Sequence, residues 1–127
     1  MRRFISVAIV SLAVVLGGCA NRAADPQAIA DETTRGVYDF DFNRTTAHFD
    51  DALKAEVTRS SVGELSNSLQ ALGTYHGLKQ IAADPEKGRY DYQASFDKGT
   101  LLVRIRLDPD QKLAAYRLVP EGTPGRS

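Results

Sequence analysis

Apolar residues recur at helical intervals through the N-terminal half of the chain. The first stretch begins at Asp25-Pro26, where aspartate suits the N-cap of a helix and proline its first position. Phe42 and Phe49, seven residues apart, indicate a second helical piece, although the polar Thr46 between them weakens the pattern. On the first helix, which begins at Pro26, the side chains expected to form the mainly apolar stripe are those of Ala30, Thr33, Val37 and Phe40. Two helical segments are therefore predicted before residue 50.

A third helix has clearer boundaries. Ser60-Ser61 is expected to cap its N-terminus, and Glu64 follows Ser61 at the spacing of a capping box. Gly73 is expected to end it, because glycine readily adopts the left-handed conformation that often follows a helix. The apolar face of this helix comprises Val62, Leu65, Leu69 and Leu72.

After Gly77 the pattern changes from a helical period to alternation, which is typical of strands with one buried face. The expected strands are residues 78–83, 90–96, 101–107 and 112–119. A Lys98-Gly99 loop joins the second strand to the third, with Gly99 able to take a positive φ. Residues 108–111 have turn chemistry and lead into the fourth strand.

These two turns predict a register. The first places Phe96 opposite Leu101, and the second, centred on Pro109-Asp110, places Ile105 opposite Ala114. Both turns then put the apolar positions on one face. The other face is expected to collect Asp91, Gln93, Ser95, Leu102, Arg104, Arg106, Leu113, Ala115 and Arg117, with Asp91 opposite Arg106. The pattern predicts an antiparallel meander with the helices packed on one side.

The first nineteen residues have the features of a bacterial lipoprotein leader. Met1-Arg2-Arg3 is basic, residues 4–16 are apolar except for two serines, and Gly17-Gly18 provides small residues for cleavage. Thirteen helical residues span about 20 Å, short of the roughly 30 Å of a hydrocarbon core. Leu16-Gly17-Gly18-Cys19 resembles the lipobox, which implies cleavage before Cys19 and lipid on its thiol. A secretory signal followed by a chance cysteine is the alternative.

The resemblance to lipoproteins divides the chain into four parts. These are a signal peptide (1–18), a lipidated tether (19–27), one domain (28–120) and a flexible tail (121–127). Lipoproteins retained in the inner membrane often carry aspartate after the cysteine, whereas Ala20-Asn21 follows here, which implies the outer membrane, facing the periplasm. Since Cys19 is the only cysteine, the domain is expected to fold on its apolar core without a disulfide.

Composition mainly excludes partners. The chain has 127 residues, 43% apolar and 25% charged, which suits one ordinary globular domain. Removal of Arg2 and Arg3 with the leader leaves 14 basic and 16 acidic residues. Nucleic acid is disfavoured as a partner, because phosphate binding needs a concentrated basic footprint. The overall charge likewise gives no indication of attraction to an anionic membrane surface.

Five segments carry a resemblance to a known family: Phe40–Phe42 (FDF), 49–54 (FDDALK), 69–73 (LQALG), 96–100 (FDKGT) and 112–120 (KLAAYRLVP). Together they resemble the bacterial domain-of-unknown-function family 3887, in the cystatin-like (nuclear-transport-factor-2-like) superfamily. Asp41 and Gln111 stand where that family usually has glycine, and Ala115 replaces a strand glycine. The resemblance implies an α+β fold with N-terminal helices on one face of a curved antiparallel sheet of three to four strands. Such a sheet forms a cone around a pocket. No activity or cofactor is implied.

No set of residues has the spacing of a metal or cofactor site. His48 and His76 are the only histidines, and zinc needs three or four ligands at workable spacing. Asp50-Asp51 offers too few oxygen ligands for calcium and suits a helix cap. We therefore expect neither a metal nor a cofactor.

Two classes of function remain open. The preferred interpretation is a non-enzymatic module that binds a protein partner or a small apolar ligand in the periplasm. The outer row Arg104, Arg106 and Arg117, with exposed Leu102 and Leu113, would be the docking face, unless it is simply a solvated sheet face.

The alternative is a small pocket enzyme of isomerase or dehydratase type. It would place Tyr92 and Tyr116 on the inner face, with His48 or Tyr75 approaching from the helices. A buried carboxylate or histidine beside a tyrosine would favour the enzyme, and an apolar lining would favour a binding pocket.

Overall fold

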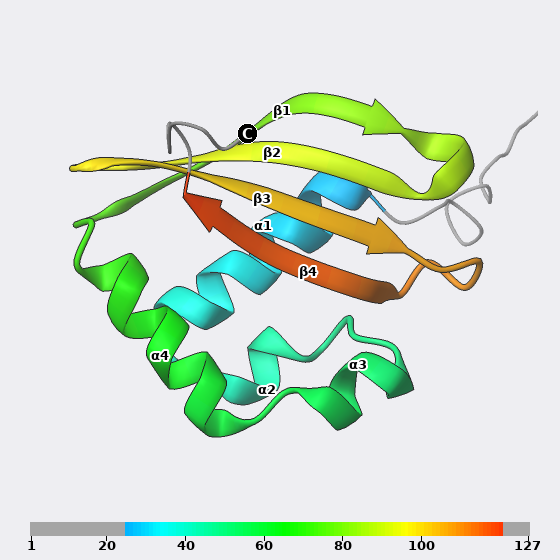
Figure 1. Ribbon diagram of the computed structural model, residues 1–127, viewed down its shortest axis with the longest axis horizontal. Helices are drawn as coiled ribbons and strands as arrows, with labels where there is room; N and C mark the ends of the chain where they lie inside the picture. Colours follow the sequence, from blue (N-terminus) through cyan, green and yellow to red (C-terminus); the bar gives the residue numbers. More distant parts are fainter. Residues whose placement is uncertain (1–24, 121–127) are drawn as a thin grey trace, which may run out of the picture.

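A layer of helices covers one face of a four-stranded antiparallel sheet (Figure 1). The computed structural model describes residues 25–120. The expected α+β fold is confirmed. The signal peptide, Cys19, most of the tether and the tail at 121–127 lie outside the described residues. Within residues 25–120, no helix is both long and apolar enough to cross a membrane.

The helices precede the strands along the chain. The helices are α1 (Pro26–Tyr38), α2 (Phe42–Thr45), α3 (Asp51–Glu56) and α4 (Arg59–Gln70). The strands are β1 (Tyr75–Asp84), β2 (Arg89–Phe96), β3 (Gly99–Leu107) and β4 (Leu113–Pro120), hydrogen-bonded in chain order. A short 3-10 helix, η2 (Pro85–Lys87), joins β1 to β2. Strands β1 and β4 are therefore the two edges.

Helix α1 begins as the sequence predicts. The carboxylate of Asp25 accepts a hydrogen bond from the Gln27 amide at 3.0 Å, and Pro26 occupies the first turn. Thr33 is fully buried because its hydroxyl donates to the Ile29 carbonyl at 2.9 Å, which satisfies the polar group. The expected burial of Phe40 is wrong, because the chain turns at this residue (φ 55°) and leaves its ring 55% exposed.

The helical piece expected over Phe42–Phe49 is only partly formed: helix α2 ends at Thr45, a turn follows, and α3 begins at Asp51. Asp41 caps α2 by accepting from the Arg44 amide, and Asp50 caps α3 by accepting from the Leu53 amide. Because Asp50 adopts the extended backbone of an N-cap, helix α2 cannot continue into α3. Phe49, between them, is buried and pairs with Leu113 at the start of β4.

The cap of α4 also differs from the prediction. Thr58, not Ser60-Ser61, is the N-cap, and it exchanges hydrogen bonds with Ser61 in a capping box, without Glu64. Val62 and Leu69 are buried against the rest of the molecule. Leu65 is 37% exposed, so the predicted apolar face is only partly covered.

The sheet has the predicted faces but a different register. Phe96 pairs with Gly99 and Ile105 with Tyr116, two residues away from the expected pairings. The β2–β3 turn is Asp97-Lys98, held by a hydrogen bond from the Lys98 amide to the Leu72 carbonyl at 2.8 Å. A shift of two residues preserves the side-chain face, because strands have a period of two.

One residue of the expected outer face does not obey this rule. A bulge between Arg106 and Leu107 lets Leu113 pair with Leu107, and Leu113 is completely buried. The expectation that Leu113 is exposed is therefore wrong, because the extra residue of a bulge reverses the alternation beyond it.

The core lies between α1 and the inner face of the sheet. Its sheet residues are Tyr75, Tyr92, Ala94, Phe96, Val103, Ile105, Leu107 and Leu113, and α1 contributes Ile29, Ala30 and Val37. Tyr38, Tyr75 and Phe96 pack their rings at centroid distances of 5.4–6.3 Å at one end. None of the helices within residues 25–120 lies on the other face of the sheet (Figure 1).

Candidate functional site

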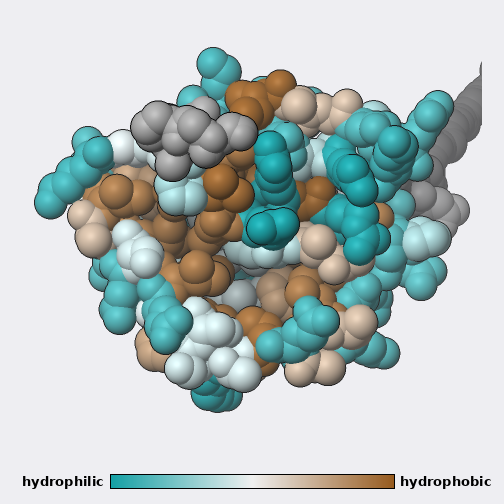
Figure 2. Space-filling view, viewed as in Figure 1, coloured by the Kyte–Doolittle hydropathy of each residue, from teal (hydrophilic) through white to brown (hydrophobic). Residues whose placement is uncertain are grey.

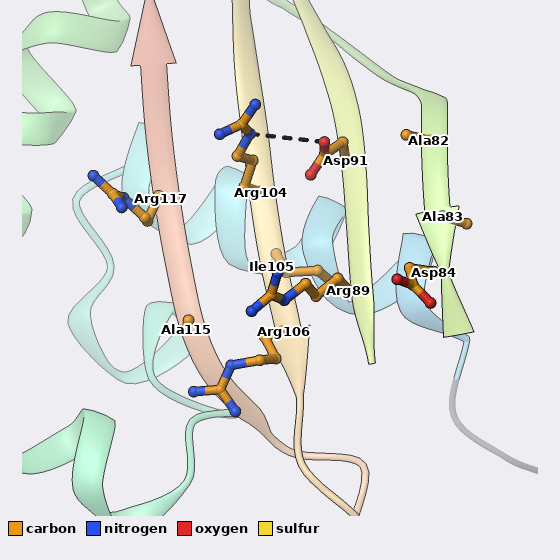
Figure 3. Close-up of a pocket in the computed structure, with 10 residues that line it drawn as sticks. All are labelled: Ala82, Ala83, Asp84, Arg89, Asp91, Arg104, Ile105, Arg106, Ala115 and Arg117. Carbon is orange, nitrogen blue, oxygen red and sulfur yellow. Dashed lines mark ion pairs between the residues drawn. The ribbon is translucent and has the colours of Figure 1, made fainter. Parts of the chain in front are cut away.

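The uncovered face of the sheet carries a hollow lined with arginine. Its volume is about 480 Å³, and its charged residues stand in two cross-strand rows (Figure 3). One row is Ala82, Asp91, Arg104 and Arg117, and the other is Asp84, Arg89, Arg106 and Ala115. We call this hollow the arginine basin and define it by these eight residues. Ala83 and Ile105 complete its lining.

Small residues at both edges make the face concave. Ala82 on β1 and Ala115 on β4 end the two rows with side chains of one carbon (Figure 3). Between them, the Arg89 side chain reaches across β3 toward Arg106 (Figure 3). The basin is shallow and open on one side, so it suits a group that protrudes from a larger partner.

The charges of the basin are unbalanced. The basin holds four arginines and two aspartates, and one ion pair joins them, from Arg104 Nε to Asp91 Oδ2 at 3.7 Å. Among residues 25–120, Arg89, Arg106 and Arg117 have no carboxylate within ion-pair distance. The guanidinium groups of these three residues are exposed and available to an anion.

Two of the cross-strand pairs place arginine opposite arginine. Arg89 on β2 faces Arg106 on β3, and Arg104 on β3 faces Arg117 on β4. Directly opposed residues on one face have Cβ atoms about 5 Å apart, and like charges there reduce stability by a few tenths to about 1 kcal/mol. The two opposed arginine pairs therefore lower the stability of the domain unless an anion compensates their charge.

Sequence reasoning found part of this site. Arg104, Arg106 and Arg117 share the outer face as predicted, but Asp91 faces Arg104 and not Arg106, because of the two-residue register shift. Arg89 and Asp84 were missed. Arg89 lies two residues before Asp91, so alternation would have placed it on the same face. The expected strand began at residue 90, one residue after the observed start, and therefore left Arg89 out.

The inner face is filled by its own side chains. Tyr92 lies on this face as predicted and is completely buried, and its hydroxyl has no hydrogen-bond partner among the described residues. Burial raises the pKa of Tyr92 to about 12. Tyr116 also faces inward, and its hydroxyl shares a hydrogen bond with the Thr34 hydroxyl at 2.7 Å. Burial raises the pKa of Tyr116 as well. Neither tyrosine lines the arginine basin.

The two histidines lie at opposite ends of the sheet. The main-chain carbonyl of His48 accepts from the Leu113 amide at 2.7 Å, where β4 begins. His76 contacts Asp97 through Nε2 at 2.6 Å, where β1 begins beside the β2–β3 turn. The Asp97 carboxylate also accepts from the Thr74 amide, and this bond, followed by the His76 contact, lowers the pKa of Asp97. Over residues 25–120, no group of three or more potential ligands gathers around a metal position.

A tyrosine–carboxylate pair exists, but away from the predicted tyrosines. The Tyr75 hydroxyl donates to Asp31 Oδ1 at 2.7 Å, and Arg35 Nε donates to Asp31 Oδ2 at 2.9 Å. Burial, followed by the bond to Asp31, raises the pKa of Tyr75 well above its ordinary value. The Arg35 guanidinium also lies 5.0 Å from the centre of the Tyr75 ring, so the three groups satisfy one another and tie β1 to α1.

The space-filling view separates two kinds of surface. Hydrophilic side chains gather over the middle of the sheet, whereas apolar side chains show between the sheet and α4 (Figure 2). Several core-contacting apolar residues are only partly buried, among them Leu72, Leu101 and Leu118. A second hollow, of about 330 Å³, lies at the end of the sheet between η2 and the β3–β4 turn.

Comparisons with family models, with curated proteins and with solved structures each found no match to this chain. The resemblance to the cystatin-like superfamily therefore stays a prediction.

Proposed function

We propose that this protein is a membrane-anchored binding module without enzymatic activity, and that the arginine basin is its binding surface for an anionic group. One observation carries the proposal: the two arginine–arginine cross-strand pairs. A face kept only for solubility gains nothing from opposing like charges. A carboxylate or phosphate between the guanidinium groups would reverse this repulsion, because arginine forms strong charge-assisted hydrogen bonds to both.

The shape of the basin supports a macromolecular partner. Sites for small molecules usually bury most of their ligand. The arginine basin is shallow, and its cationic groups are exposed along the uncovered face of the sheet. It can therefore receive one or two anionic groups that project from a surface. The proposed partner is therefore a macromolecule with anionic groups, and not the small apolar ligand that the sequence also allowed.

The enzyme alternative has one observation in its favour, the Tyr75–Asp31 pair. A tyrosine beside a carboxylate is the arrangement expected for the isomerase or dehydratase class. However, the Tyr75 hydroxyl donates to Asp31, and its raised pKa opposes proton exchange near neutral pH. Neither residue lines one of the two described cavities. Binding is favoured for these reasons.

The anchoring part of the proposal rests on Leu16-Gly17-Gly18-Cys19. By its lipobox, the mature protein would begin at an acylated Cys19 and face the periplasm from the outer membrane. Metabolic labelling with a tagged fatty acid tests this directly. Cys19→Ser should abolish labelling and leave the precursor uncleaved. Normal labelling of the Cys19→Ser protein would reject the anchor.

The binding part is tested on the mature protein in micelles of a non-ionic detergent. Pentaglutamate and inorganic phosphate are titrated in turn, while NMR follows the arginine Nε–Hε signals. We expect shifts at Arg89, Arg106 and Arg117, and Arg106→Gln should weaken binding roughly tenfold, the worth of one charge-assisted hydrogen bond. Lys54→Gln, an exposed cation on α3, is the control and should leave affinity unchanged. Equal shifts at the helical arginines would contradict a specific basin.

A further inference from the structure

The two layers of the domain carry opposite charge. Residues 25–73, which form the helical layer, contain nine carboxylates and four cationic side chains. Residues 74–120, which form the sheet, contain eight cationic side chains and six carboxylates. The neutral total of the whole chain conceals this separation. Such a domain is an electric dipole, and near an anionic surface it turns its sheet toward that surface.

The attachment of the chain lies close to the basin. The first turn of α1 is held to β1 by a hydrogen bond from Gln27 Nε2 to the Leu78 carbonyl at 3.3 Å. In Figure 3 this turn lies behind β1, on the side of the basin formed by Ala82 and Asp84. Because β1 is an edge strand, the chain enters the domain beside the basin.

The tether is short compared with the domain. Five residues lie between Cys19 and Asp25, so the fully extended chain from one to the other spans about 20 Å at most. From α1 to the outer plane of the sheet is on the order of 10 Å, the usual separation of packed layers. A lipid on Cys19 therefore allows the basin to lie against the membrane surface. It also keeps the basin within reach of headgroup phosphates.

We propose that the arginine basin binds the phosphate headgroups of the membrane in which the protein is anchored, so that the domain lies with its sheet on the bilayer and its acidic helices toward the periplasm. This inference rests on the proposed function, since it names the partner of the same basin. Three observations support it: the unpaired Arg89, Arg106 and Arg117, the opposite charge of the layers, and the short tether beside β1. An acidic protein would meet the same arginines but would not need the tether to enter at this edge.

The test uses the mature, acylated protein in lipid nanodiscs. A gadolinium chelate on a small fraction of headgroups enhances the relaxation of nearby amide protons, and NMR compares β3 and β4 with α4. In discs with phosphatidylglycerol, enhancement should be several-fold greater for the sheet than for α4. In purely zwitterionic discs the two layers should differ much less. Each arginine removed should reduce the ratio of sheet-down to other orientations about fivefold.

The matched variants are Arg106→Gln with Arg117→Gln, and Lys54→Gln with Arg59→Gln. Both pairs remove two positive charges, the first from the basin and the second from the helical layer. We expect only the first pair to abolish the difference between layers. An equal effect of the two pairs would overturn the inference, because net charge alone would then explain the orientation.

Comparison with the micelle titration separates the two proposals. If pentaglutamate shifts the basin arginines while anionic discs produce no sheet-down orientation, a protein partner replaces the membrane and the proposed function stands. If neither phosphate nor pentaglutamate shifts them, and no orientation is seen, both proposals fail. If phosphate binds and the sheet turns to the bilayer, both are supported.

Discussion

Removing the hydroxyls of Tyr92 and Tyr116 should change stability in opposite directions. Both changes, Tyr92→Phe and Tyr116→Phe, delete one oxygen from a residue on the inner face of the sheet. The Tyr92 hydroxyl is buried without a partner among the described residues. The Tyr116 hydroxyl shares a 2.7 Å hydrogen bond with Thr34, which is itself fully buried. The Tyr92 hydroxyl therefore destabilises the folded state, whereas the Tyr116 hydroxyl stabilises it.

The magnitudes follow from the cost of burying polar groups. An unsatisfied buried hydroxyl costs about 1–3 kcal/mol, so Tyr92→Phe should raise the free energy of unfolding by about 1 kcal/mol. Tyr116→Phe loses a hydrogen bond and leaves the Thr34 hydroxyl unsatisfied, so it should lower that free energy by about 1–2 kcal/mol. In a domain of this size, the two variants should differ in melting temperature by about 10 °C.

Urea unfolding of residues 24–127, followed by far-ultraviolet circular dichroism, measures the difference. The slope of the free energy with urea should stay constant, which shows that both variants unfold from the same compact state. Equal losses of stability would refute the reasoning, because Tyr92 would then have a partner that its surroundings do not indicate. A stable Tyr116→Phe protein with no cellular function would instead favour the enzyme alternative.

Three further predictions concern the sheet and its turns. Val103→Asp should unfold the domain, since an unpaired charge at this fully buried site costs several kcal/mol of a total of about 5–15, whereas Leu102→Asp on the outer face should be tolerated in the same urea titration. Asp97→Asn should lower the melting temperature near pH 6. The lowered pKa of Asp97 means that its contribution is present above the unfolded value of about 3.9 and lost as pH falls through the folded value, so the two melting curves should converge in acid. Gln111→Gly should raise the free energy of unfolding by about 0.5–1 kcal/mol, because Gln111 has a φ of 68°, and unchanged thermal melts would contradict this strain.

Alternation predicted the faces of the sheet but could not set its register. Tyr92 and Val103 lie inside and Arg104 outside, because these assignments depend only on local period. The register depends on which residues form each turn. Asp97 and Lys98 are fixed by contacts with Thr74 and Leu72, which precede β1 and are distant in sequence. The prediction of a Lys98-Gly99 loop is therefore wrong, because Gly99 is the first residue of β3.

Two residues other than glycine have a positive φ. Gln111 has a φ of 68°, a conformation that glycine would adopt without strain. Phe40 has a φ of 55° and lies one residue before Asp41, which caps α2. The exposure of Phe40 follows from this turn and has no signal in the apolar pattern.

The candidate site was predictable in kind but not in composition. Arg104, Arg106 and Arg117 are visible on one face from alternation alone. The opposed arginine pairs require the observed register, since the expected one placed Asp91 beside Arg106. The separation of charge between helices and sheet emerges only when the charges of each layer are counted separately, because the whole chain is neutral.

The most direct measurement of the central claim is the affinity of the mature protein for inorganic phosphate after Asp91→Asn. Asp91 is the carboxylate that pairs with Arg104 in the basin, at 3.7 Å. Exposed ion pairs contribute up to about 1 kcal/mol, so freeing Arg104 should strengthen phosphate binding roughly threefold. Asp51→Asn, on the helical layer, should have no effect. If Asp91→Asn leaves the dissociation constant unchanged or weakens binding, the arginine basin is not the binding surface.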